Sequence, residues 1–342
     1  MMILQELSDA IGVSGNEDDV RAILIAAVRD HVDQIDIDAM GNVLALKRGS
    51  EQDRLRVMLA AHMDEIGLMV VGHDDDGHLK VRTVGGIDSR LLPGTVFAVG
   101  SDRIPGVIGV KPIHLLKSGE ADKVPKIEDL VLDIGAKDKD EAEKLAPLGT
   151  YAAFATRFQE LGKAVSGKAF DDRAGCAVLV ELLRGDRFAF DLHAAFTVQE
   201  EVGLRGARVA AFSIDPDCAF ALEGTIADEI PKEKDVSATT QMGKGPAITV
   251  MDRSFIADRR LVRLLIDTAE EQQIPYQIKQ PGMGGTDAGA IHLVREGVPS
   301  ATVAVPSRYI HSPVALLSLD DFDNTVRLMR ESLSRLTRDL LE

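Results

Sequence analysis

The sequence contains no tryptophan, and aromatic residues make up only 4% of its 342 positions. This scarcity argues against an enzyme that acts on sugars, because sugar rings stack on the flat faces of aromatic side chains. Cysteine is also rare, since only Cys176 and Cys218 are present and both stand among apolar residues. They are typical of small buried hydrophobic residues, which argues against a disulfide framework and predicts a cytoplasmic protein.

The sequence also lacks an excess of basic residues and any long hydrophobic run. Its formal net charge of -16 argues against nucleic acid as a partner, because binding to phosphates requires a basic face. The longest apolar runs, "RVMLAA" (56–61) and "AGCAVLVELL" (174–183), are well short of the roughly 20 residues of a membrane span. The N-terminus has no basic segment followed by an apolar stretch and a cleavage site, so we expect neither a signal peptide nor a membrane partner.

What the sequence does contain is an alternation of amphipathic segments and short apolar runs. Helical periodicity appears around residues 18–29, 173–184, 258–272, 287–295 and 320–337. Apolar, β-branched runs predict strands at 43–46, 55–60, 193–198, 218–222, 247–250 and 301–305. Strands that alternate with helices predict an α/β fold with a mixed, mostly parallel sheet flanked by helices. In such sheets, ligands bind beyond the carboxyl ends of the strands.

The segment 69–164 differs from the rest of the chain, because glycine and proline punctuate it every several residues. It opens with two β-type runs joined by an Asp/Gly turn in "VVGHDDDGHLKVRTVGG" (70–86). We interpret it as an inserted β-rich domain, for which a small barrel is one expected form, with residues 1–68 plus 165–342 forming the main domain. The insertion adds nothing obvious to the predicted site described next.

Ionisable residues cluster in five stretches of the main domain. The clearest is "RLRVMLAAHMDEIG" (54–67), where a buried-strand pattern runs directly into His62 and Asp64. Burying two such groups without partners is costly, so either the chain surfaces there or a bound cation pairs with them. The other stretches are "GKAFDDRAG" (Asp171, Asp172), "FTVQEEVGLRG" (Glu200, Glu201), "FALEGT" (Glu223) and "SRYIHSPV" (His311).

Four of these five stretches directly follow a predicted strand, and the fifth opens a helix. Taken singly, each has a simple structural explanation, such as a strand end, an Asp-capped helix or a solvated turn. Together, two histidines and several carboxylates without thiolates favour a site for Zn²⁺, Co²⁺ or Mn²⁺ at one edge of the sheet. Two such cations about 3.5–4 Å apart can polarise a carbonyl and activate a water molecule.

The sequence resembles the M42 family of metallo-aminopeptidases, the tetrahedral or TET aminopeptidases, over essentially its whole length. The resemblance is carried by "AAHMDEIG", "GKAFDDRAG", "QEEVGLRGA", "GGTDAGAI" and "RYIHSP", in this order. Some members of the family are labelled glutamyl aminopeptidase and others endoglucanase. The resemblance implies a dinuclear metal-dependent aminopeptidase that removes N-terminal residues from short peptides through a metal-activated water. It implies two divalent cations per subunit, zinc in the first place, with cobalt or manganese as alternatives.

The resemblance also implies the metal ligands. His62, Asp171 and Glu223 are expected around one metal, with Asp171 as the bridge. Asp171, Glu201 and His311 are expected around the other metal, and the division of the terminal ligands between the two metals stays open. Many relatives carry Asp at the position of Glu223, and this departure puts substrate preference in doubt more than activity.

The resemblance further implies two catalytic roles, Glu200 as general base and Asp64 as the carboxylate that orients His62. Successive side chains of an extended segment diverge, so Glu201 can bind a metal while Glu200 faces the attacking water. The Asp171–Asp172 peptide bond is similar to one that is cis in relatives.

The substrate pocket is predicted to include Thr286, Asp287, Arg308 and Tyr309, together with part of "IADEIP" (226–231). A basic residue in this pocket would favour acidic substrates, whereas Asp228 and Glu229 would favour basic ones. The preferred N-terminal residue and the native metal therefore stay open at this point.

In relatives, the inserted domain is PDZ-like and mediates dimerisation, and six dimers form a hollow tetrahedral dodecamer. The resemblance therefore implies a homo-oligomer, between dimer and tetrahedral dodecamer, whose other partners are short peptides. Three alternatives stay open: a deacylase or other metal amidohydrolase, a glycosidase that uses Glu200 and Glu201, and a metal-binding assembly protein without catalysis. The glycosidase leaves His62 and His311 unexplained, and the assembly protein leaves Glu200 without a purpose.

Overall fold

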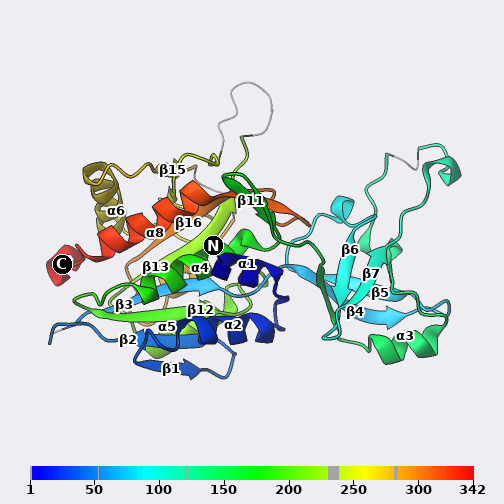
Figure 1. Cartoon of the computed structure of the whole chain (residues 1–342), viewed down its shortest axis with the longest axis horizontal. Coiled ribbons are helices and arrows are strands. Elements are labelled where there is room, and N and C mark those ends of the chain that lie inside the picture. Colours follow the sequence, from blue (N-terminus) through cyan, green and yellow to red (C-terminus); the bar gives the residue numbers. More distant parts are fainter. Residues whose placement is uncertain (1, 53, 120–121, 230–238, 281–283) are drawn as a thin grey trace.

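The computed structural model describes residues 2–52, 54–119, 122–229, 239–280 and 284–342. A large sheet with its helices and a smaller β-structure beside it make up the molecule (Figure 1). Within these described ranges, each helix is too short or too polar to cross a lipid bilayer.

Eleven strands of the described chain form the large sheet. Their order is β1-β2-β12-β3-β13-β16-β17-β11-β10; off this path, β14 pairs with β16, and β15 pairs with β14. The bounds are β1 Gln34–Ile37, β2 Val43–Lys47, β3 Arg56–His62, β10 Gln159–Leu161, β11 Ala164–Gly167, β12 Asp191–Thr197, β13 Cys218–Ile226, β14 Ala247–Thr249, β15 Gln277–Lys279, β16 Ser300–Arg308 and β17 Ala315–Ser318. Pairing is parallel across β12, β3, β13 and β16 and between β14 and β15. The predicted α/β fold with a mixed sheet is confirmed. The sheet is not mostly parallel, however, because the strands that flank the parallel part pair antiparallel.

Helices cover both faces of the parallel strands, which explains why these strands are apolar without alternation. On β3, Val57 and Leu59 join the core under one layer of helices, and Met58 and Ala60 join the core on the opposite side. The first layer contains α1 Met2–Asp9, α2 Asp18–Val28, α4 Phe170–Arg184, α6 Arg259–Glu271 and α8 Leu319–Leu333. The second layer contains α5 Arg205–Ile214 and α7 Ala288–Ile291, and α9 Arg338–Leu341 ends the chain.

The inserted segment forms a closed antiparallel barrel with its own hydrophobic core (Figure 1). Its strand order is β4-β5-β8-β7-β6-β9, with bounds β4 Gly67–His73, β5 Leu79–Val84, β6 Val96–Val99, β7 Ile104–Ile108, β8 Val131–Asp133 and β9 Tyr151–Phe154. Helix α3 Lys139–Leu145 packs on it, and short 3₁₀ turns lie at 89–91, 113–115 and 127–129. The predicted Asp/Gly turn joins β4 to β5, where Asp74 accepts the N–H groups of Asp76 and His78 and Gly77 has φ +88°.

Two details of the structure refine the sequence-based boundaries. Helix α7 ends at Ile291 rather than near residue 295, and turns occupy the following residues, among which Arg295 has a left-handed φ of 53°. Strand β10 pairs with β11 in the large sheet, whereas the barrel strands all lie between Gly67 and Phe154. The division of the chain into domains at 69–164 stays our own proposal.

Candidate metal centre

The topology brings the ionisable residues of distant motifs to one edge of the sheet. His62 is the last residue of β3, and Glu223 lies in β13, the parallel neighbour of β3. Glu200 and Glu201 follow the end of β12, and His311 follows the end of β16. Because these four strands are parallel neighbours, their carboxyl ends meet at the same edge.

The first cluster of ligand atoms surrounds His62, which is 1% exposed. Its Nε2 lies 3.4 Å from Asp171 Oδ1, 3.7 Å from Glu223 Oε2 and 4.0 Å from Glu200 Oε2. Glu223 is as deeply buried and sits on the same side of the imidazole ring as the other carboxylates. One nitrogen thus faces three carboxylates, an arrangement that suits a cation in their midst.

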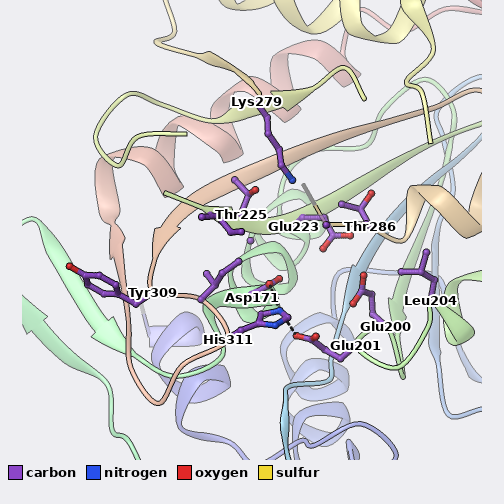
Figure 2. Close-up of a pocket in the computed structure, with 15 residues that line it drawn as sticks. Asp171, Glu200, Glu201, Leu204, Glu223, Thr225, Lys279, Thr286, Tyr309 and His311 are labelled. Atoms are coloured by element: carbon purple, nitrogen blue, oxygen red, sulfur yellow. Dashed lines mark ion pairs between the residues drawn. The ribbon is translucent and has the colours of Figure 1, made fainter. Parts of the chain in front are cut away.

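The second cluster surrounds His311, whose side chain is more exposed than that of His62. Its Nε2 lies 3.2 Å from Glu201 Oε1 and 3.4 Å from Asp171 Oδ2, and these side chains point toward one another in Figure 2. His311 has φ 57°, a left-handed conformation that is uncommon for residues other than glycine. Such conformations gather at functional sites, where the surrounding structure holds them in place.

Asp171 lies between the two histidines, whereas the carboxylate oxygens of its neighbour Asp172 accept hydrogen bonds from backbone N–H groups. Two groups of three residues could each hold a cation, because one ligand atom from each member lies within 4.8 Å of the others. The groups are His62, Asp172 and Glu223, and Asp171, Glu201 and His311. However, Asp172 Oδ2 accepts the His62 N–H at 3.1 Å and Oδ1 accepts the Gly175 N–H at 2.8 Å. Asp171 instead directs one oxygen toward each histidine, so it is the carboxylate that could serve both clusters. The peptide bond between the two aspartates is cis, as expected from the sequence.

Both imidazole rings are oriented so that, in the neutral form that binds a metal, Nε2 carries the lone pair. His62 Nδ1 lies 3.2 Å from the carbonyl oxygen of Asp64, and His311 Nδ1 lies 3.0 Å from the carbonyl oxygen of Gly86. A carbonyl oxygen can only accept, so Nδ1 carries the hydrogen in both rings. Metal-binding histidines are commonly oriented in this way by an acceptor on the far side of the ring.

Asp64 also fixes the backbone that carries the two adjacent glutamates. The N–H of Glu200 donates to Asp64 Oδ1 at 2.9 Å, and the N–H of Glu201 donates to Oδ2 at 3.1 Å. The Ser14 hydroxyl donates to the same carboxylate at 2.6 Å, and Asp64 Oδ1 lies 3.3 Å from His62 Nδ1. One buried carboxylate therefore sets the positions of three side chains of the site.

The charge of the cluster fits a cation. Burial and neighbouring carboxylates raise the pKa of Glu200, Glu201 and Glu223 above the usual range. Burial alone would lower the pKa of His311, but its hydrogen bonds to Asp171 and Glu201 raise it to about 11. The carboxylates thus repel one another and attract any positive charge nearby. A divalent cation coordinated by these oxygens and by Nε2 would offset that repulsion.

The profile of the M42 glutamyl aminopeptidase family matches residues 41–328. The chain belongs to this family. The M42 match spans both the barrel and the strands that carry the site, and it agrees with the motifs seen in the sequence. The chain is thus an aminopeptidase by family.

Individual M42 relatives agree with this assignment over nearly the whole chain. A lysyl aminopeptidase of Pyrococcus furiosus is 36% identical over 344 residues, which is 98% of this chain and 96% of the relative. An aminopeptidase structure from the archaeon Desulfurococcus kamchatkensis has a TM-score of 0.94 at 37% identity, covering 100% of this chain and 96% of that one. A TET1 peptidase of Pyrococcus horikoshii, described as assembling into a tetrahedron or a large octahedral shell, has a TM-score of 0.87 at 37% identity, covering 98% and 99%.

A cavity of about 530 Å³ opens beside the candidate metal centre of this M42 aminopeptidase. Thr286 and Tyr309 line it, as predicted for the substrate pocket, and Tyr309 is half exposed. Asp287 and Arg308 are not among its lining residues. Of the stretch 226–231, Ile226 lines the cavity, and residues 230–231 lie outside the described residues.

Asp287 and Arg308 are held by other contacts. The Asp287 N–H donates to Glu223 Oε1 at 3.1 Å, and Asp287 Oδ2 accepts the Thr197 hydroxyl at 2.5 Å. Burial raises the pKa of Asp287 to about 6. Arg308 forms an ion pair with Glu229. Asp287 therefore contacts the candidate ligand Glu223 without lining the cavity. The charge of Arg308 is neutralised by Glu229, and Arg308 does not line the cavity either.

The sequence analysis did not identify two residues that contribute to the site, Gly86 and Lys279. Gly86, whose carbonyl orients His311, follows β5 of the barrel, so the insertion does contribute to the site. A backbone carbonyl leaves no signal in the sequence. Lys279 lines the cavity from the end of β15, and nothing in "YQIKQ" marks it as functional.

Proposed function

We propose that this M42 aminopeptidase removes N-terminal residues from short peptides with two divalent cations bound by His62, Asp171, Glu201, Glu223 and His311. The observation that carries the proposal is Asp171, whose two carboxylate oxygens each lie 3.4 Å from a different histidine Nε2. His62 and Glu223 complete one site and Glu201 and His311 the other. Zinc is the first candidate, with cobalt or manganese as alternatives, because all three accept nitrogen and oxygen ligands.

Glu200 is the general base of the proposed mechanism. When bound, the cations would polarise the scissile carbonyl and make the attacking water more acidic. Glu200 lines the cavity beside the ligands, and Asp64 fixes its backbone. Glu200 is not among the proposed ligands, so its carboxylate is free to act as a base on the attacking water. It accepts the proton of the water and later delivers it to the leaving amine.

The free α-amine of the substrate is the group that separates an aminopeptidase from a deacylase. Carboxylates of the cavity can hold a charged amine, whereas an acylated amine has no charge to offer. We therefore expect peptides with a free N-terminus and an amidated C-terminus to be hydrolysed, and their N-acetylated counterparts to be poor substrates. Release of the first residue is measured by chromatography for the matched pair of peptides. Faster hydrolysis of the acetylated peptide would favour the deacylase.

The alternatives with other chemistry receive no support from the geometry. A glycosidase needs two carboxylates and no metal. Here Glu200 and Glu201 lie beside two histidines whose Nε2 atoms face carboxylates. An assembly protein without catalysis has no need for Glu200 beside the ligands. The expected cytoplasmic location is part of the proposal and is supported by the two buried free cysteines.

We also propose that the barrel mediates assembly, from a dimer to a tetrahedral dodecamer. The barrel segment carries exposed apolar side chains at Val110, Ile113, Leu115 and Val124, and such groups mark protein interfaces. The related TET1 peptidase of Pyrococcus horikoshii supports the same proposal. Light scattering should give a mass many times the 36.9 kDa of one chain. A fully active monomer at every concentration would contradict the proposal.

A further inference from the structure

Side chains, rather than a helix or a strand, fix the backbone that carries the two adjacent glutamates of the site. Residues 198–201, which we call the glutamate turn, lie between β12 and α5, and their four N–H groups each donate to a side-chain oxygen. Asp64 accepts two of these N–H groups, as described above. The acceptors of the other two are Asn42 and Glu17, which lie far away in the sequence and outside the motifs of the site.

Asn42 connects the two ends of the loop between β12 and α5. It is fully buried, and it reaches this loop because the next residue, Val43, pairs with Phe196 of β12. Its Oδ1 accepts the Val198 N–H at 2.9 Å, and its Nδ2 donates to the Gly206 carbonyl oxygen at 3.0 Å. Gly206 leaves no room for a side chain here, since a Cβ atom would lie 2.3 Å from Asn42 Oδ1. The start of the glutamate turn is therefore fixed against β2 and α5.

Among the residues that the structure describes, no cation pairs with the buried carboxylate of Glu17. Burying such a charge without a counter-charge is costly. Glu17 precedes α2, yet its side chain makes no capping hydrogen bond to that helix. Its Oε1 instead accepts the N–H of Gly15 at 2.7 Å and the N–H of Gln199 at 3.3 Å. A role within its own turn explains the contact with Gly15 but not the contact with Gln199, which is 182 positions away.

The conformation of the glutamate turn decides where its two carboxylates point. Gln199 has φ 56°, a left-handed conformation that is uncommon for residues other than glycine. Beyond it the two side chains diverge, and Figure 2 shows Glu201 directed at His311. Glu200 Oε2 instead lies 4.0 Å from His62 Nε2. A rotation of this backbone would turn both carboxylates away from these positions.

We propose that Glu17 and Asn42 are positioning residues of the reaction, which act through the glutamate turn to direct Glu200 at the attacking water. This inference rests on the proposed function, in which Glu200 is the general base. Neither Glu17 nor Asn42 lines the cavity, so neither touches the substrate. Asp64 accepts the N–H of Glu201 independently of both. Loss of Glu17 or Asn42 should therefore disturb the base more than the proposed metal ligands.

The test removes the hydrogen-bond acceptor of Glu17 while keeping the length of its side chain. In the metal-loaded enzyme, Glu17→Met should lower kcat by about 10- to 100-fold, because displacing a reacting group by about 1 Å can cost about 10²-fold in rate. Glu17→Gln keeps an oxygen acceptor and should retain kcat within a few-fold of the wild type. Bound metal per subunit should match the wild type in both variants. The matched control is Glu6→Met, at an exposed position of α1, which should leave kcat unchanged.

A double-mutant cycle distinguishes positioning from a general loss of structure. If Glu17 acts through Glu200, Glu17→Met should change kcat by less than about twofold in the Glu200→Gln background, where there is no base left to misplace. A destabilised protein would instead lose the same factor in both backgrounds, and that result would overturn the proposal. An unchanged kcat for Glu17→Met in the wild-type background would overturn it as well. Asn42→Leu, which keeps a similar shape without polar atoms, should follow the same pattern.

Amide hydrogen exchange of the metal-loaded protein separates this inference from the proposed function, because it requires no catalysis. In the wild type, the four N–H groups of the glutamate turn should exchange slowly although they lie in a loop, and Glu17→Met should accelerate exchange at Gln199 and Glu200. If exchange follows this pattern but Glu200→Gln keeps full activity, the base of the proposed function is wrong and the turn is still fixed by Glu17. If Glu200→Gln loses activity while Glu17→Met changes neither exchange nor kcat, the proposed function stands and the role of Glu17 is wrong.

Discussion

Replacing Glu200 with glutamine is expected to lower kcat by about 10²–10⁴-fold while leaving the metal content at the wild-type level. Glutamine keeps the shape of the side chain and the backbone hydrogen bond to Asp64, but it cannot accept a proton from the attacking water. The proposed ligands are untouched, so the cations should still bind. The measurement is kcat together with elemental analysis of the same sample.

Glu201→Gln is the matched control, because it changes the adjacent residue in the same way. Glu201 Oε1 lies 3.2 Å from His311 Nε2, so its loss should weaken one metal site. Activity should fall, and excess metal should restore part of it. The roles of the two glutamates are reversed if Glu200→Gln loses metal and Glu201→Gln keeps it. If neither variant changes kcat by more than a few-fold, the proposed mechanism is wrong.

Removing the cations is expected to abolish hydrolysis of a free-amine substrate altogether. Without a cation, the carboxylates of the site repel one another, and the histidines take up protons that they share with Asp171 and Glu201. Nothing then polarises the scissile carbonyl. Activity is measured after exhaustive chelation and again after addition of Zn²⁺, Co²⁺ or Mn²⁺, and each added metal that fits the ligands should restore it. Circular dichroism of the chelated protein checks that the fold is retained.

The positions of the ligands could be predicted because the parallel sheet imposes a simple rule. A charged residue just beyond an apolar strand, as at His62 or His311, lies at the carboxyl edge of the sheet. Neighbouring strands bring such residues together whatever their distance in sequence. Their chemistry then follows from the residue types alone. The helix predicted over 173–184 from its periodicity is confirmed as the body of α4, which packs against β13 and β3.

The wall of the pocket could not be predicted in this way. Lys279 reaches the cavity because β15 pairs with β14 at a position that no motif marks. Arg308 stands beside Tyr309 in the sequence, but its ion pair with Glu229 draws it away from the cavity. Such contacts depend on tertiary packing between segments far apart in the chain. The candidate metal ligands could therefore be predicted from sequence motifs, whereas the residues of the cavity wall were identified from the structure.

The most direct test of the account is a metal titration of the chelated protein, with bound metal and activity measured on the same samples. The position of Asp171 between the two histidines, together with the proposed function, predicts that each subunit binds two cations and that full activity requires both. Asp171→Asn should bind fewer cations and lose activity in parallel. Full activity in metal-free protein, or at one bound cation per subunit with no further gain, would contradict the dinuclear mechanism.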